Sequence, residues 1–114
     1  MGLDFRGADA HWSYSGFNKF RIRLIAEVGF PGAWDKLINF HVVPNGLKKD
    51  AIWPLLNHSD CDGELTVEEM KLIEPRLREI VSRWPEDDYD KQHGLLLADG
   101  MLDCILEGIP LEFT

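Results

Sequence analysis

The chain has 114 residues, of which 45% are hydrophobic and 28% are charged, and this balance is typical of one compact domain with a single apolar core. Its formal net charge is −8, and the acidity lies in residues 51–114, which contain fifteen Asp and Glu but only five Lys and Arg. Such a surface repels nucleic acid and anionic lipid, so we expect no direct binding to nucleic acid or membrane and instead expect a cation or another protein as partner.

The cellular compartment is predicted from the cysteines and from the lack of targeting patterns. Cys61 and Cys104 are the only two cysteines, and the N-terminus shows no basic stretch followed by an apolar core. No run approaches the ~20 consecutive apolar residues that span a bilayer. These features predict a cytoplasmic protein with reduced thiols, and they leave its oligomeric state open.

The two ends of the chain carry short alternating patterns. Leu3 and Phe5 alternate with Asp4 and Arg6, and residues 111–113 show the same alternation. A period of two residues is typical of a strand with one buried face. We therefore predict that the two ends pair as a minimal β ribbon.

A first helix is predicted over residues 15–28. Ser13 or Ser15 is a favourable N-cap residue, and Gly29 favours termination. At ~100° per residue, the apolar side chains on one face are Phe17, Phe20, Leu24 and Val28. Arg21 lies beside this face, and we expect its guanidinium to reach solvent along the apolar surface instead of meeting a buried carboxylate.

The middle of the chain is predicted to be an irregular connector followed by a helix. Residues 31–38 have the pattern of a short helix, and residues 40–43 have that of a brief extended segment. Residues 47–56 predict a further helix. Pro54 interrupts or restarts this helix, because proline lacks an amide proton and clashes with the preceding turn.

The next helix is predicted to begin at residue 67. Thr66 and Glu69 have the spacing of a capping box, in which each side chain binds the main-chain N–H of the other residue. Apolar residues continue at helical spacing to residue 84, with a kink or a new first turn at Pro75.

The last helix is predicted over residues 88–107 and ends at Gly108. Its apolar residues occur nearly all round, so we expect it to be the buried centre of the fold. Together the elements predict a mainly α fold. This fold is a compact bundle of four to five helices in one domain over residues 1–114, built around a central helix-loop-helix and accompanied by no more strand than the terminal ribbon.

The loop before residue 67 has the spacing of a calcium-binding loop. Calcium requires six or more oxygen ligands from a tight turn, so an EF-hand loop places ligands at alternate positions, a glycine sixth and a bidentate glutamate twelfth. With Gly63 in sixth place, the ligand positions after the first are Asp60, Asp62, Glu64 through its carbonyl, Thr66 and Glu69. The segment therefore resembles an EF-hand loop, and the resemblance implies that these five residues bind Ca²⁺ or Mg²⁺ weakly.

The same residues have a second interpretation. His58 occupies the first position, where calcium prefers an oxygen ligand. An Asp-x-Asp-Gly run is also a turn signal, and the capping box alone accounts for Thr66 and Glu69. EF-hands usually act in pairs, and the sequence shows one such loop. A weak calcium site and a capped turn without metal therefore both remain open.

An acidic run precedes the last helix and consists of Glu86, Asp87, Asp88 and Asp90. It is interpreted either as a solvated loop or as a surface that offers phosphate-like charge to a basic protein. No nucleophile, pair of catalytic acids or phosphate-binding loop occurs at motif spacing, so we predict that the protein is not an enzyme.

Residues 11–17, 59–66 and 111–113 together resemble small uncharacterised proteins of bacteria and their phages, and this resemblance implies no activity. The sequence therefore predicts a small acidic intracellular protein that binds another protein, and it leaves weak Ca²⁺ binding through residues 58–69 open beside the metal-free turn. The alternative is a bacterial or phage inhibitor whose acidic surface occupies the basic, nucleic-acid-binding site of a partner enzyme.

Overall fold

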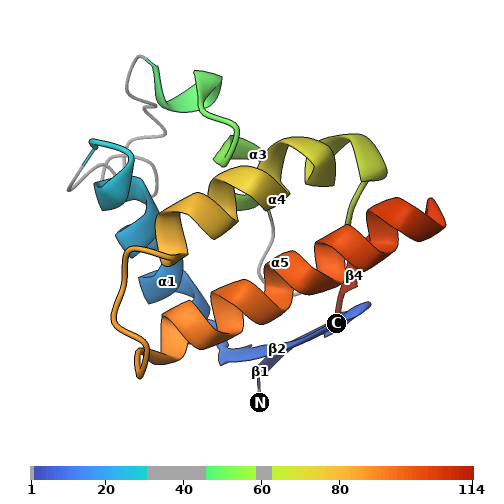
Figure 1. Ribbon diagram of the computed structural model, residues 1–114, viewed down its shortest axis with the longest axis horizontal. Helices are drawn as coiled ribbons and strands as arrows, with labels where there is room; N and C mark the ends of the chain where they lie inside the picture. The colour runs from blue at the N-terminus through green and yellow to red at the C-terminus, as the bar shows by residue number, and fades with distance from the viewer. Residues whose placement is uncertain (1, 31–45, 59–62) are drawn as a thin grey trace.

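The computed structural model describes residues 2–30, 46–58 and 63–114. These residues form two layers (Figure 1). One layer is a four-stranded antiparallel sheet, and the other contains the helices α1 (Tyr14–Glu27), α4 (Val67–Val81) and α5 (Tyr89–Glu107) on one side of that sheet. The prediction of a mainly α bundle is therefore wrong, because the sheet is a complete layer and the fold is α+β.

The first two strands, β1 (Gly2–Arg6) and β2 (Ala8–Ser13), form a hairpin around Gly7, whose φ of 117° suits glycine. The residues of β2 alternate between exposed and buried positions, and Trp12 is among the buried ones. The sequence does not predict β2, because the segment contains no β-branched residue and leads directly into a helix. Its period of two residues is the one signal that distinguishes it from a loop.

The other two strands bring distant parts of the chain together. The order in the sheet is β2-β1-β4-β3, in which β4 (Leu111–Phe113) lies between β1 and β3 (Glu64–Leu65). Phe5 lies opposite Phe113, and Leu65 lies opposite Leu111. The two ends of the chain do pair, but they pair inside a four-stranded sheet and not as a minimal ribbon.

Each of the three long helices begins directly after a residue whose side chain caps it. The Ser13 hydroxyl accepts the N–H of Gly16 at 3.0 Å, and the Asp88 carboxylate accepts that of Lys91 at 3.1 Å. The predicted capping box of α4 is present, and this helix continues through Pro75. Gly108 ends α5 in the left-handed conformation, with a φ of 72°. The helix predictions for these three segments are confirmed within a few residues of each boundary.

Residues 47–56 do not form one helix. They contain a single 3₁₀ turn, η1 (Leu47–Lys49), and a one-turn helix, α3 (Trp53–Leu56), with Pro54 in its first turn. Asp50 separates the two pieces, because its backbone is extended and its side chain accepts the N–H of Ile52 at 3.0 Å. The helix predicted to lead into the calcium-like loop is thus a single turn. The elements predicted over residues 31–38 and 40–43 lie outside the described residues.

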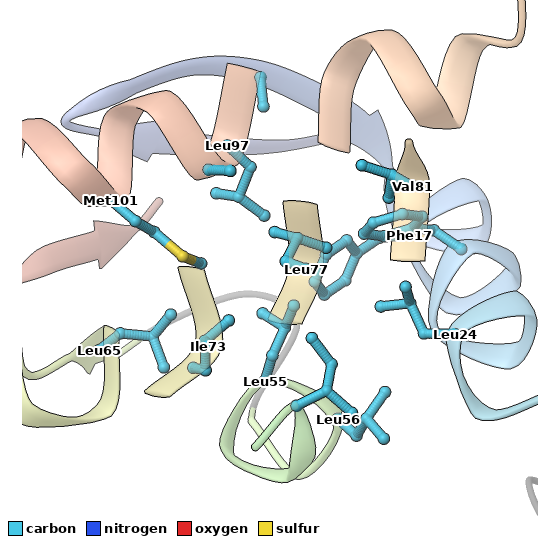
Figure 2. Packing of buried hydrophobic residues seen from close by; sticks show 14 of the residues in the cluster. Phe17, Leu24, Leu55, Leu56, Leu65, Ile73, Leu77, Val81, Leu97 and Met101 are labelled. Carbon is cyan, nitrogen blue, oxygen red and sulfur yellow. The ribbon is translucent and has the colours of Figure 1, made fainter. Parts of the chain in front are cut away.

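The two layers share one hydrophobic core (Figure 2). This core extends from Phe17 and Leu24 of α1, past Leu77 of α4 and Leu97 of α5, to Leu65 of β3, and all five side chains are fully buried. Burial of apolar area of this kind is the dominant favourable contribution to folding.

Helix α5 is not the buried centre that its composition suggests. One side of it packs on β2 and α4 and buries Leu97 and Met101. The opposite side faces solvent, where Leu102 is 39% exposed and Leu106 is 77% exposed. The prediction of burial all round is therefore wrong, because among the described elements α4 and the sheet cover one side of α5 and leave the other side exposed.

Candidate functional site

The described part of the predicted calcium loop is closed by hydrogen bonds between its own residues. Asp60 and Asp62 lie outside the described residues. Glu64 lies in β3, and Thr66 and Glu69 form the capping box of α4. A single oxygen of Glu69, Oε1, accepts the Thr66 N–H at 3.0 Å and the Thr66 hydroxyl at 3.2 Å. The carboxylate that would bind calcium in a bidentate manner is thus engaged with the helix N-terminus.

His58, at the first position of the loop, contacts the seventh position. Its Nε2 donates to the carbonyl oxygen of Glu64 at 3.0 Å, and its ring stacks on Phe113 with centroids 4.0 Å apart. Gly63, between them in the chain, has a φ of 87°, the conformation that the sharp turn of such a loop requires. The histidine therefore joins two ligand positions of the loop through a hydrogen bond.

Arg21 is buried next to the start of the same loop. It is only 5% exposed, so the prediction that its guanidinium reaches solvent is wrong. Its Nη1 donates to the carbonyl oxygens of His58 at 2.6 Å and Leu56 at 3.4 Å, and its Nη2 donates to Asn18 at 2.5 Å. A guanidinium, which is always protonated, thus places a positive charge at the end of α3.

The acidic run before α5 serves mainly the fold itself. Arg23 binds the carboxylates of Asp88 at 2.9 Å and Asp90 at 2.8 Å, and its guanidinium lies over the ring of Trp84. The hydrogen bond from Arg23 is the main cause of the lowered pKa of Asp88. Lys91 binds Glu86 at 2.6 Å. Within the described part of the chain, Asp87 alone of the four carboxylates makes no ion pair.

A different set of carboxylates lies along the outward face of α5. This acidic stripe consists of Asp99, Asp103 and Glu107, which recur at four-residue spacing. Arg78 of α4 binds Asp99 at 2.9 Å, whereas Asp103 and Glu107 make no ion pair with any described residue. Both are exposed.

Apolar side chains lie next to the acidic stripe. This apolar ridge consists of Leu102, Leu106 and Ile109, and Ile109 is 45% exposed. Leu102 and Leu106 are one helical turn apart, so they lie on the same side of α5. The sequence does not predict this surface, because apolar residues occur nearly all round α5. The spacing of the three carboxylates is the signal that marks an outward face.

A hollow of about 260 Å³ borders the acidic stripe on its other side. It lies between α5 and the turn of the β1–β2 hairpin, where Gly100 of α5 approaches Ala8 and the Gly7 carbonyl. Three aspartates line it, namely Asp9, Asp99 and Asp103. The hollow is therefore suited to a cationic side chain.

Side chains of α5 cover the outer edge of β2. The N–H of His11 donates to Nδ1 of His93 at 2.9 Å, and the Tyr89 hydroxyl donates to the His11 carbonyl oxygen at 2.5 Å. The rings of Tyr89 and His93 stack with centroids 4.0 Å apart. These two residues satisfy the main-chain groups that an edge strand otherwise offers to another chain.

The His11–His93 hydrogen bond is expected to make stability depend on pH. The pKa of His93 is lowered, first by burial and then by the nearby His11, against an opposing effect of Asp90. Protonated Nδ1 cannot accept the His11 N–H, so the folded state favours neutral His93. The unfolded chain takes up the proton first as pH falls through about 6.5, and stability is lost below that pH.

The test compares the wild type with His93→Gln, whose amide oxygen accepts the same N–H at any pH. Between about pH 7.5 and 5.5, the wild type is expected to lose about 1 kcal/mol more than the variant, the usual net contribution of one hydrogen bond. Urea denaturation at each pH measures the difference. Equal losses for the two proteins would contradict the assignment.

The described residues contain no group of three or more His, Cys, Asp or Glu side chains arranged to hold a metal ion. Among the helices of the described ranges, none combines the length and the apolar character needed to cross a bilayer. Comparison of the chain with protein-family models, with curated proteins and with solved structures finds no match.

Proposed function

We propose that the protein acts by binding another protein through its acidic surface. The observation that carries this proposal is the outward face of α5, where the carboxylates of Asp103 and Glu107, which pair with no cation of the described residues, adjoin exposed Leu102 and Leu106. Carboxylates alone are typical of a solvated face, and isolated exposed leucines are common on monomers. Their combination on one helix favours a surface that a partner covers.

The experiment is capture of partners from a lysate of the source cells, followed by titration of the purified partner. The variant neutralises four carboxylates that, within the described ranges, make no ion pair or only a weak exposed one: Glu68→Gln, Asp87→Asn, Asp103→Asn and Glu107→Gln. The wild type is expected to bind a basic protein at least about tenfold more tightly than the variant, with an affinity that falls as salt rises. Equal affinity of the two proteins would overturn the proposal.

A more specific form of the proposal makes the partner a nucleic-acid-binding enzyme that the protein inhibits. The charge of residues 51–114 supports it, because a basic groove that holds phosphates also attracts carboxylates. Duplex DNA is then expected to compete with the protein for the captured partner. Simultaneous binding of both would exclude this form and leave the general proposal intact.

We infer a second candidate function, weak binding of Ca²⁺ or Mg²⁺ by Asp60, Asp62, Glu64, Thr66 and Glu69. The left-handed conformation of Gly63 supports it, because the sixth position of a calcium loop requires that turn. The existing bonds of Glu64 and Glu69 and the positive charge of Arg21 all oppose a cation, so the expected affinity is millimolar.

Calcium titration tests this candidate directly. Amide chemical shifts of Gly63, Glu64 and Glu69 are expected to change at about 1 mM Ca²⁺ in the wild type and to stay constant in Asp62→Asn. Thr66→Ser is the matched control, since it retains the hydroxyl. No change in the wild type up to about 10 mM Ca²⁺ would exclude a physiological site and leave a capped turn.

A further inference from the structure

We propose that the C-terminal half of α5 binds an amphipathic basic helix of another protein, an assignment that rests on the protein-binding function proposed above. The surface has three adjacent parts: the apolar ridge, the acidic stripe and the aspartate-lined hollow. Together they specify the chemistry of the occupant.

The apolar ridge defines where the partner sits. Leu106 is 77% exposed and is flanked by Leu102 one turn before it and by Ile109 just after the helix ends. Contact with one face of a helical partner would remove the exposed parts of all three side chains from water, which favours binding. The ridge is small, so the complex belongs with weak or transient ones.

The acidic stripe defines the sign of the partner's charge. Like charges four residues apart repel each other on a helix, and negative charge is unfavourable near a helix C-terminus. The last turn of α5 carries no basic residue to offset either effect. The negative potential also acts on buried Cys104: burial raises the pKa of its thiol most, and Glu107 and Asp103 raise it further. Basic side chains of a partner would relieve this repulsion.

The hollow can accommodate one of those basic side chains. Asp9, Asp99 and Asp103 line its 260 Å³, beside the stripe and on the side away from Leu102 and Leu106. A lysine or arginine that reaches over the stripe would therefore meet carboxylates from both β2 and α5.

Charge also excludes a second copy of this chain as the occupant. Each copy would bring a net charge of −8 and an identical acidic stripe to the contact. Like charges placed against each other across an interface cost several kcal/mol. A helix is the favoured form of the partner because Leu102 and Leu106 are four residues apart on α5, the spacing at which another helix presents its own apolar side chains.

The test uses a fluorescent peptide of leucine and lysine with helical periodicity, about 18 residues or about five turns long. Fluorescence anisotropy measures its affinity for the intact protein. A peptide of the same composition with alternating order, and one with glutamate in place of lysine, are the ligand controls. The wild type is expected to bind the first peptide at least about tenfold more tightly than either control.

Two pairs of variants locate the binding. Leu102→Ser with Leu106→Ser is expected to weaken binding at least about tenfold, or about 1.4 kcal/mol. Leu72→Ser, on the outer face of α4, is expected to leave it within about twofold, although Leu72 is 56% exposed. Asp103→Asn with Glu107→Gln is expected to weaken binding and reduce its salt dependence more than Glu68→Gln with Asp87→Asn, which removes the same charge elsewhere. All these side chains are exposed, so the variants retain the fold, which far-UV circular dichroism verifies.

Two results would overturn the assignment. In the first, the wild type does not distinguish the helical peptide from its controls. In the second, the two charge-neutralised variants weaken binding equally, so that binding follows net charge and not this surface. In either case a captured protein partner that requires the four neutralised carboxylates would still support the proposed function. Failure of the capture experiment would instead contradict the proposed function itself.

Discussion

Replacement of Trp12 by alanine is expected to lower the free energy of unfolding by about 3–5 kcal/mol, the usual cost of removing a large aromatic side chain from a core. Trp12 is 2% exposed, stacks on Phe20 with centroids 4.7 Å apart, and contacts the edge of Phe5. Its Nε1 donates to Asp90 at 3.0 Å. Since a small domain has about 5–15 kcal/mol of total stability, this one change removes a large part of it.

Urea denaturation followed by far-UV circular dichroism measures the loss without relying on the fluorescence of the replaced residue. Trp12→Phe is the control. It keeps an aromatic ring and removes the N–H, while Asp90 retains its ion pair with Arg23. The control is expected to lose about 1–2 kcal/mol. A loss below about 1 kcal/mol in Trp12→Ala would show that β2 does not lie on the core as described.

Gly100→Ala is expected to be the most damaging small substitution in α5. A Cβ at this position would lie 2.5 Å from the Gly7 carbonyl oxygen and 2.6 Å from the Ala8 Cα. These are main-chain atoms of the β1–β2 turn, so they yield only if the hairpin moves away from the helix. The expected cost is about 2–3 kcal/mol, even though alanine favours a helix over glycine by about 1 kcal/mol.

Gly94→Ala in the same helix is the matched comparison. Its Cβ would also be crowded, but by the Val81 side chain at 2.9 Å, which shifts more easily than a backbone. Gly94→Ala is therefore expected to cost less than Gly100→Ala in thermal or urea denaturation. The reverse order would contradict the close approach of α5 to the hairpin.

Both substitutions concern contacts that the sequence does not predict. Gly100 is recognisable as a residue that lowers helix propensity, but its close neighbour is Ala8, far away in the chain. Trp12 is recognisable as a core residue, but its strand pairs with β1 through a turn at Gly7 that no sequence motif marks. Such contacts depend on how the layers pack, and local patterns carry no information about packing.

The contacts of the candidate site likewise include some that the sequence predicts and others that it does not. The capping box of Thr66 and Glu69 was predictable, because both partners lie within one turn of the chain. The bond from His58 to the Glu64 carbonyl was not, although the residues are close in sequence, because β3 holds Glu64 in place through its pairing with β4. The acidic run before α5 is interpreted from the sequence either as a solvated loop or as a surface for a partner, and neither interpretation includes Arg23 of α1, which binds two of its four carboxylates.

The sequence by itself determined the three long helices, the N-caps of the first two, the charge of the second half and most of the apolar core residues. Each of these depends on neighbours within a few positions, which is the range over which capping, periodicity and side-chain spacing act. Only the tertiary structure decided that the strands form a sheet, that Arg21 is buried, and that one side of α5 faces solvent. These features depend on contacts between elements that are far apart in the sequence, and such contacts form only when the whole chain packs together.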